Sequence, residues 1–131
     1  MRHLMGKAAM LDDRQLLVEV GNTKARWNQT SVELVVLVSE VDHRKLALKQ
    51  GFSSTFVFCT QRLGMSESRA GRIMQVARLA RRFPRVLEGL RDGAYHLTGL
   101  ALVARLIDAG NLEFVLKGIA GKSKRKVEEF V

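Results

Sequence analysis

The chain has 131 residues, 47% of them hydrophobic, which suits one domain with a single modest core. It carries 22 Lys and Arg against 13 Asp and Glu, a net charge of +9, so a polyanionic partner is favoured and nucleic acid fits best. No apolar run reaches the roughly 18 residues that a membrane-spanning helix needs. The one cysteine, Cys59, has no partner for a disulfide, which is typical of a reducing cytosol.

The N-terminal part of the chain predicts a flexible start and one helix. Residues 1–10 are basic with small side chains, and we expect them to form a flexible N-terminus. Asp12 or Asp13 can cap the helix that follows, because a carboxylate accepts hydrogen bonds from free N–H groups at a helix start. The pair Gly21-Asn22 is expected to interrupt this helix or to end it.

A longer helix of roughly 20 residues is predicted from residue 27 onward. Its apolar positions recur at close to seven residues per two turns, namely Trp27, Leu34, Leu37, Val38, Val41 and Leu48. The run 32–38 is the one place where a strand competes, because β-branched residues favour sheets. We favour helix, since no turn flanks the run and no second strand is available. Because this helix is apolar over much of its circumference, we also expect it to form a homodimer seam.

Residues 54–85 predict a helix, a tight turn and a second helix. Gly64 ends the first segment, Ser66 can cap the second, and Pro84 ends it. At 100° per residue, the second helix gathers five apolar residues on one arc, namely Ala70, Ile73, Met74, Ala77 and Ala80. Cys59 lies at an apolar position of the first helix and is expected in the core. This order is typical of a helix-turn-helix.

The charge of the second helix indicates its function. Seven arginines lie in residues 62–85 against one acid, Glu67, whereas an ordinary solvated helix mixes both signs. The arc opposite the apolar one holds Ser68, Arg72, Gln75, Arg78 and Arg82, with Arg69 at its margin. We interpret this as a recognition helix for nucleic acid, and the alternative is an ordinary amphipathic surface helix. Gly71, which has no side chain, would let the helix backbone come close to a duplex.

Three short helices are predicted after the arginine-rich helix, and each is bounded by a capping residue or a glycine. They begin near Pro84, Leu97 and Asn111, and the first two end at Gly93 and Gly110.

A last helix opens at Ser123 with a strongly basic start, residues 122–126. Basic residues at a helix start interact unfavourably with the helix dipole, so this cluster either lowers the stability of the helix or serves to bind a partner. The stretch 118–123 is superficially similar to a phosphate-binding loop, but the first glycine of that motif would fall on Leu116, and no strand precedes it. We therefore expect no nucleotide site.

No catalytic or metal-binding constellation is evident. His3, His43 and His96 are scattered without metal-ligand spacing, and Cys59 has no flanking base. We expect the protein to be no enzyme and to need no cofactor and no metal.

Six short stretches carry a resemblance to a known family. They are residues 40–44 (EVDHR), 51–59 (GFSSTFVFC), 63–67 (LGMSE), 81–84 (RRFP), 97–100 (LTGL) and 121–125 (GKSKR). In them the chain resembles the N-terminal helical region of bacterial proteins described as HNH endonucleases, over about residues 11–131. Residues 63–106 are more loosely similar to the central DNA-binding part of ParB-type partition proteins. The resemblance implies a helical DNA-recognition module; nuclease activity is not implied, because the chain has no His-Asn-His metal site.

We therefore predict an all-α bacterial protein, cytoplasmic and nucleoid-associated, whose single domain (residues 11–131) binds double-stranded DNA through a helix-turn-helix and serves transcription regulation. Ser68, Arg72 and Gln75 are expected to approach base edges, and the other basic residues to hold phosphates. The candidate DNA-binding residues are Ser66, Ser68, Arg69, Arg72, Gln75, Arg78, Arg81, Arg82, Arg85, Lys122, Lys124, Arg125 and Lys126. Two alternatives stay open: a protein-interaction or dimerisation module, and the DNA-targeting part of an HNH nuclease whose catalytic domain lies outside this chain.

Overall fold

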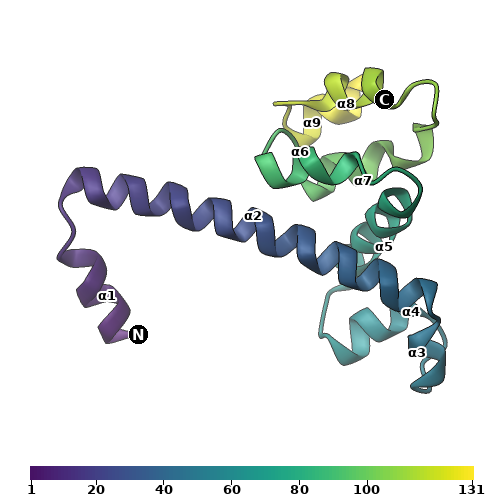
Figure 1. Cartoon of the computed structure of the whole chain (residues 1–131), viewed down its shortest axis with the longest axis horizontal. Helices are drawn as coiled ribbons and strands as arrows, with labels where there is room; N and C mark the ends of the chain where they lie inside the picture. The colour runs from purple at the N-terminus through teal and green to yellow at the C-terminus, as the bar shows by residue number, and fades with distance from the viewer.

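The computed structural model describes residues 1–131, and all of its regular elements are helical (Figure 1). The predicted all-α class is confirmed. The elements are α1 (Arg2–Ala9), α2 (Asp13–His43), α3 (Leu46–Lys49), α4 (Thr55–Val57), the π-helical turn η1 (Phe58–Arg62), α5 (Glu67–Arg82), α6 (Val86–Asp92), α7 (Leu97–Val103), the 3₁₀ turn η2 (Ala104–Leu106), α8 (Leu112–Ile119) and α9 (Lys124–Phe130). None of these helices is both long and apolar enough to cross a membrane.

Helix α2 is one continuous helix of 31 residues, so the expected break at Gly21 is wrong. Asp12 caps its start: the Asp12 carboxylate accepts from the backbone N–H of Gln15 at 2.7 Å, and the Gln15 side chain accepts from the Asp12 N–H at 3.0 Å. The helix passes through Gly21 because one glycine costs only about 1 kcal/mol in a helix interior, and helix propagation is cooperative. The expected flexible N-terminus, residues 1–10, holds helix α1, none of whose residues is buried.

The C-terminal part of α2 supports the core. Val35 and Val38 are buried there, and the run 32–38 lies wholly inside the helix, so helix is confirmed over strand. The helix ends at His43, and Lys45 two residues later adopts a left-handed conformation with φ of 56°. The predicted helix therefore stops before Leu48, which belongs to α3.

The π-helical turn η1 directly continues α4, and a turn over residues 63–66 joins η1 to α5. Ser54 and Ser66 cap the two helices, each hydroxyl accepting a hydrogen bond from a backbone N–H three residues on, at 3.0 and 3.2 Å. Gly64 has a φ of 70° in this turn, a conformation that glycine adopts without steric cost. The boundaries predicted for these two helices are confirmed.

Helix α5 is the central element of the core and packs against α2 and α7 (Figure 1). All five residues of the predicted apolar arc are buried, and Val76 and Leu79 are buried with them. Cys59 is fully buried against the same cluster, as expected. With neighbours on two sides, α5 keeps only one face in solvent.

The C-terminal helices complete the core. The hydroxyl of the buried Tyr95 donates a hydrogen bond to the backbone carbonyl of Val86, which ties the start of α6 to the loop that follows this helix. Gly89 makes room for the Tyr95 ring, because a Cβ at Gly89 would overlap it. Pro84 and Arg85 form a turn, so α6 begins at Val86 and not at the predicted Pro84.

Candidate nucleic-acid interface

The face of α5 that remains in solvent holds most of the polar residues predicted to read DNA. We call it the solvent face of α5, and it consists of Glu67, Ser68, Gly71, Gln75, Arg78 and Arg82. At 100° per residue, Gly71 lies near its centre, and no atom lies within 4 Å of the position that a Cβ would take there. At Gly71 the helix carries no side chain that would hold a duplex away from its backbone.

Arg72 lies at the edge of the solvent face and not in its middle, which corrects its expected position. Around the helix axis it falls between Val76 and Leu79, which are both buried, and Arg72 itself is half-buried. The expected arc was drawn from five apolar residues, and it omitted these two because α7 covers a second side of the helix. Arg72 consequently points into a groove beside α5.

This groove has a volume of about 280 Å³ and lies between the middle of α2, the first half of α5 and the segment that leads into α7. Its polar lining includes Lys24, Arg69, Arg72 and His96, and no carboxylate lines it. We call it the basic groove. The Lys24 ammonium donates to the Asn28 side-chain oxygen at 2.8 Å, and neither arginine forms an ion pair. The groove thus concentrates positive charge that the protein itself does not neutralise.

Two other predicted arginines are paired with carboxylates of α2. Arg78 Nε lies 3.4 Å from Asp42 Oδ2, and Arg81 Nη1 lies 3.1 Å from Glu40 Oε1. Asp42 also accepts a hydrogen bond of 2.9 Å from the Thr55 hydroxyl on α4. Asp42 therefore links α2 to both helices that flank the turn over residues 63–66, which holds α5 at a defined angle to α4.

The carboxylate of Glu40 is shared between two guanidinium groups. Arg44 Nε donates to it at 2.8 Å, from one helical turn further on, and Arg81 reaches it from α5. These hydrogen bonds, that of Arg44 first, hold the pKa of Glu40 below its ordinary value of 4.5. The group stays ionised at neutral pH, so Arg81 has an anionic partner within the fold, which it shares with Arg44.

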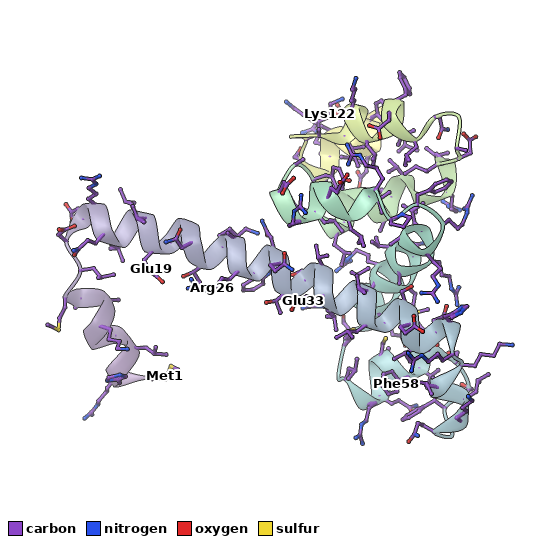
Figure 2. All side chains as sticks on the ribbon, viewed as in Figure 1. Met1, Glu19, Arg26, Glu33, Phe58 and Lys122 are labelled. Atoms are coloured by element: carbon purple, nitrogen blue, oxygen red, sulfur yellow. The ribbon has the colours of Figure 1, made fainter.

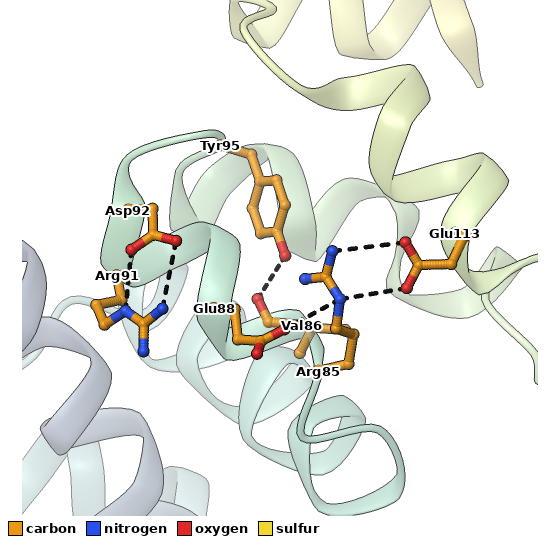
Figure 3. A network of polar contacts seen from close by, with 7 residues as sticks. All are labelled: Arg85, Val86, Glu88, Arg91, Asp92, Tyr95 and Glu113. Atoms are coloured by element: carbon orange, nitrogen blue, oxygen red, sulfur yellow. Dashed lines mark hydrogen bonds and ion pairs between the residues drawn. The ribbon is translucent and has the colours of Figure 1, made fainter.

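Arg85 is paired as well, on the side of the molecule formed by α6 and α8 (Figure 3). Its Nε lies 3.0 Å from Glu88 and 3.2 Å from Glu113. The same close-up shows Arg91 paired with Asp92 at 2.9 Å, and this hydrogen bond lowers the pKa of Asp92. Arg85 therefore connects two helices, and its charge is balanced by two carboxylates.

The basic C-terminal cluster lies on α9 and the turn before it, and α9 packs mainly on α7 and α8. Lys124 and Arg125 pair with the glutamates four residues further on, at 4.0 and 3.6 Å. The Lys122 ammonium lies 5.0 Å from the centroid of the Phe130 ring. Lys126 has no carboxylate within pairing distance. Two of the four basic residues of the cluster are thus paired with carboxylates at the surface, and Lys122 and Lys126 are not.

The remaining predicted residues lie at the two ends of α5. Ser66 uses its hydroxyl to cap the helix, and the guanidinium of Arg82 lies 5.0 Å from the centroid of the Phe83 ring, with no carboxylate partner. The sequence-based prediction missed Lys24, Asn28 and His96 altogether. They come from segments distant from α5 in the chain, and no local pattern could place them beside it.

The metal-ligating residue types are dispersed in the structure. No group of three His, Cys, Asp or Glu residues is arranged to hold a metal ion. Burial, and to a lesser extent the nearby charge of Asp42, raises the pKa of the Cys59 thiol. A thiol with a raised pKa is a poor nucleophile at neutral pH, so Cys59 acts as a core residue.

Comparison of the chain with protein-family models, with curated proteins and with solved structures finds no match.

Proposed function

We propose that the chain binds double-stranded DNA, with the solvent face of α5 in the major groove and the basic groove against the phosphate backbone beside it. One observation carries the proposal. Of the arginines on and around α5, those near its start, Arg69 and Arg72, have no carboxylate partner and converge on a groove without acids. Two guanidinium groups that face one groove without an anion repel each other, and a phosphate would supply the anion.

The other residues of the interface follow from their positions. Ser68 and Gln75 project from the solvent face and can reach base edges, where a glutamine pairs with adenine through two hydrogen bonds. Gly71 between them permits close approach of the helix. Arg82, which has no ion-pair partner, would contact a phosphate at the far end of α5. Arg78, Arg81 and Arg85 orient the interface through their ion pairs.

The units α4, η1 and α5 would then act as a helix-turn-helix in which α5 is the recognition helix. Such a module would fit a role in transcription regulation, in a bacterial protein that is associated with the nucleoid.

The test is the salt dependence of DNA affinity. If Lys24, Arg69, Arg72 and Arg82 each neutralise one phosphate, the slope of log K against log salt is about −3.6, so that a fourfold rise in salt weakens binding about 150-fold. In the variant Arg69→Gln/Arg72→Gln, the slope should fall to about −1.8 and the loss to about 12-fold. Glutamine retains part of the side-chain stem, so the packing of Arg72 changes little.

Arg91→Gln is the matched control, because it removes one positive charge that is paired with Asp92 on α6. We expect its salt slope to equal that of the unmodified chain. If Arg69→Gln/Arg72→Gln and Arg91→Gln lowered the salt slope of DNA affinity by the same amount per charge, the basic surface would be diffuse. That result would overturn the proposal. Tight binding to an acidic polypeptide, together with a negligible affinity for any duplex, would favour the protein-interaction alternative.

A further inference from the structure

The first 30 residues form an arm whose outer part, before Lys24, stands clear of the rest of the molecule (Figures 1 and 2), whereas Lys24, Trp27 and Asn28 also line the basic groove. No residue of α1 is buried, and the buried residues of α2 begin only at Val35. Large apolar side chains on the arm are exposed to water, including Val20 at 60% and Trp27 at 67%. Exposed apolar side chains that gather on one element usually mark an interaction surface.

Three large apolar residues of the arm, Leu16, Val20 and Trp27, fall at heptad spacing, whereas the exposed Leu17 and Val18 lie off this line. With alternating steps of four and three residues, one stripe runs along α2 through Leu16, Val20, Thr23, Trp27, Thr30, Leu34, Leu37 and Val41. We call it the heptad stripe. A period of 3.5 residues is the pattern by which one helix packs along another in a coiled coil. Leu34 and Val41 are half-buried against the core with Leu37 exposed between them, so the longest open part of the stripe is its N-terminal half.

A groove follows this open part of the stripe. It has a volume of about 1210 Å³ and lies between α1 and α2, lined by Leu4, Ala8 and Leu11 on one side and by Leu16, Val20 and Trp27 on the other. Small-molecule pockets are commonly roughly 300–1,000 Å³ and largely enclosed, whereas this groove is larger and open along the helix. Its apolar floor and its heptad spacing match a helix as occupant.

We infer that the occupant is the α2 arm of a second copy of this chain, packed antiparallel so that the two copies form a homodimer. In this direction, Trp27 packs against Leu16 of the second copy, and Val20 packs against Thr23 of the second copy, so that large and small residues alternate. A parallel pair would instead place two tryptophans in one layer and two threonines in another, which packs less evenly.

Charge at the edge of the heptad stripe agrees with this arrangement. Glu19 and Arg26 lie on the same edge, seven residues apart, and pair within the chain at 3.1 Å. In the antiparallel dimer, Glu19 of each copy faces Arg26 of the other, so the edge presents two complementary pairs and no like-charge contact. Complementary edge charges of this kind select partner and direction in coiled coils. The inference does not depend on DNA binding.

The test compares two variants of the full chain that carry the same chemical change. Val20→Glu puts a charge on the open part of the heptad stripe. Val36→Glu puts it on an exposed position of the same helix, outside the groove and on the opposite side from the stripe. Light scattering after size exclusion should give twice the 14.7 kDa chain mass for the unmodified chain and for Val36→Glu.

For Val20→Glu we expect the monomer mass and a dimer dissociation constant raised at least about 100-fold, because an unpaired carboxylate in an apolar seam is heavily penalised. Circular dichroism checks that both variants remain folded. A monomeric unmodified chain at all concentrations overturns the inference, and so does a Val20→Glu chain that stays dimeric.

Oxidative cross-linking tests the direction. The variant Leu16→Cys/Trp27→Cys should form a covalent dimer, because the two positions face each other between copies and lie too far apart within one helix to pair. Leu16→Cys alone should not, because Leu16 does not meet itself in the antiparallel pair. Cross-linking of the single variant would mean a parallel dimer and would refute the proposed packing.

Discussion

Replacing Gly71 by alanine separates the demands of folding from those of DNA binding. Gly71 lies in the interior of α5, in the middle of the solvent face, and nothing lies within 4 Å of the position that the new Cβ would take. Alanine therefore meets no steric obstacle and has the higher helix propensity, by about 0.8–1.0 kcal/mol. For a domain of this length, that gain raises the melting temperature by roughly 3 °C.

If the backbone of α5 approaches a duplex at Gly71, the added methyl group separates the two surfaces. We then expect Gly71→Ala to bind DNA about 10-fold more weakly, a loss of about 1.4 kcal/mol, although it is the more stable protein. Thermal unfolding and fluorescence anisotropy with a labelled duplex measure the two effects.

Gly21→Ala is the matched control, because Gly21 also lies inside a helix with open space around its Cβ, but on the arm. Its DNA affinity should not change. Unchanged or tighter DNA binding by Gly71→Ala would refute a close approach at this position and with it the assignment of the solvent face of α5 to the major groove.

Three further predictions concern the fold. Because the pKa of Glu40 is lowered in the folded state, its ion pairs stabilise the protein above the ordinary pKa of 4.5, and this contribution is lost as pH falls through the folded-state pKa. Glu40→Gln should therefore lower the melting temperature at neutral pH. In acid its melting temperature should match that of the unmodified chain. Gly89→Ala should destabilise the protein by about 2–3 kcal/mol in urea unfolding, because the new methyl group overlaps the Tyr95 ring, and a smaller loss would mean that the ring moves at little cost. Cys59, buried and with a raised pKa, should react with iodoacetamide far more slowly in the native chain than in urea, and equal rates would show that this part of the core opens readily.

Local pattern in the sequence was sufficient to predict much of the helical framework. The caps at Ser66 and Ser123 and the turn at Gly64 all lie where the sequence places them. These features depend on residues within one helical turn of one another, and such short-range rules are visible along the chain. Gly21 was misjudged because the cooperativity of a long helix overrides one unfavourable residue.

The candidate interface depended on contacts that no local pattern contains. The sequence shows seven arginines in residues 62–85 with one acid nearby, and it predicts six of them, all but Arg62, as part of one basic surface. The tertiary structure brings Glu40 and Asp42 from α2 and Glu113 from α8 to three of them, and it leaves Arg69 and Arg72 without partners in a groove that Lys24 also lines. Composition and periodicity determined that the protein is helical, basic and amphipathic along α5. Which of its charges remain free was decided only by the packing of distant helices, because an ion pair depends on distance in space and not on separation along the chain.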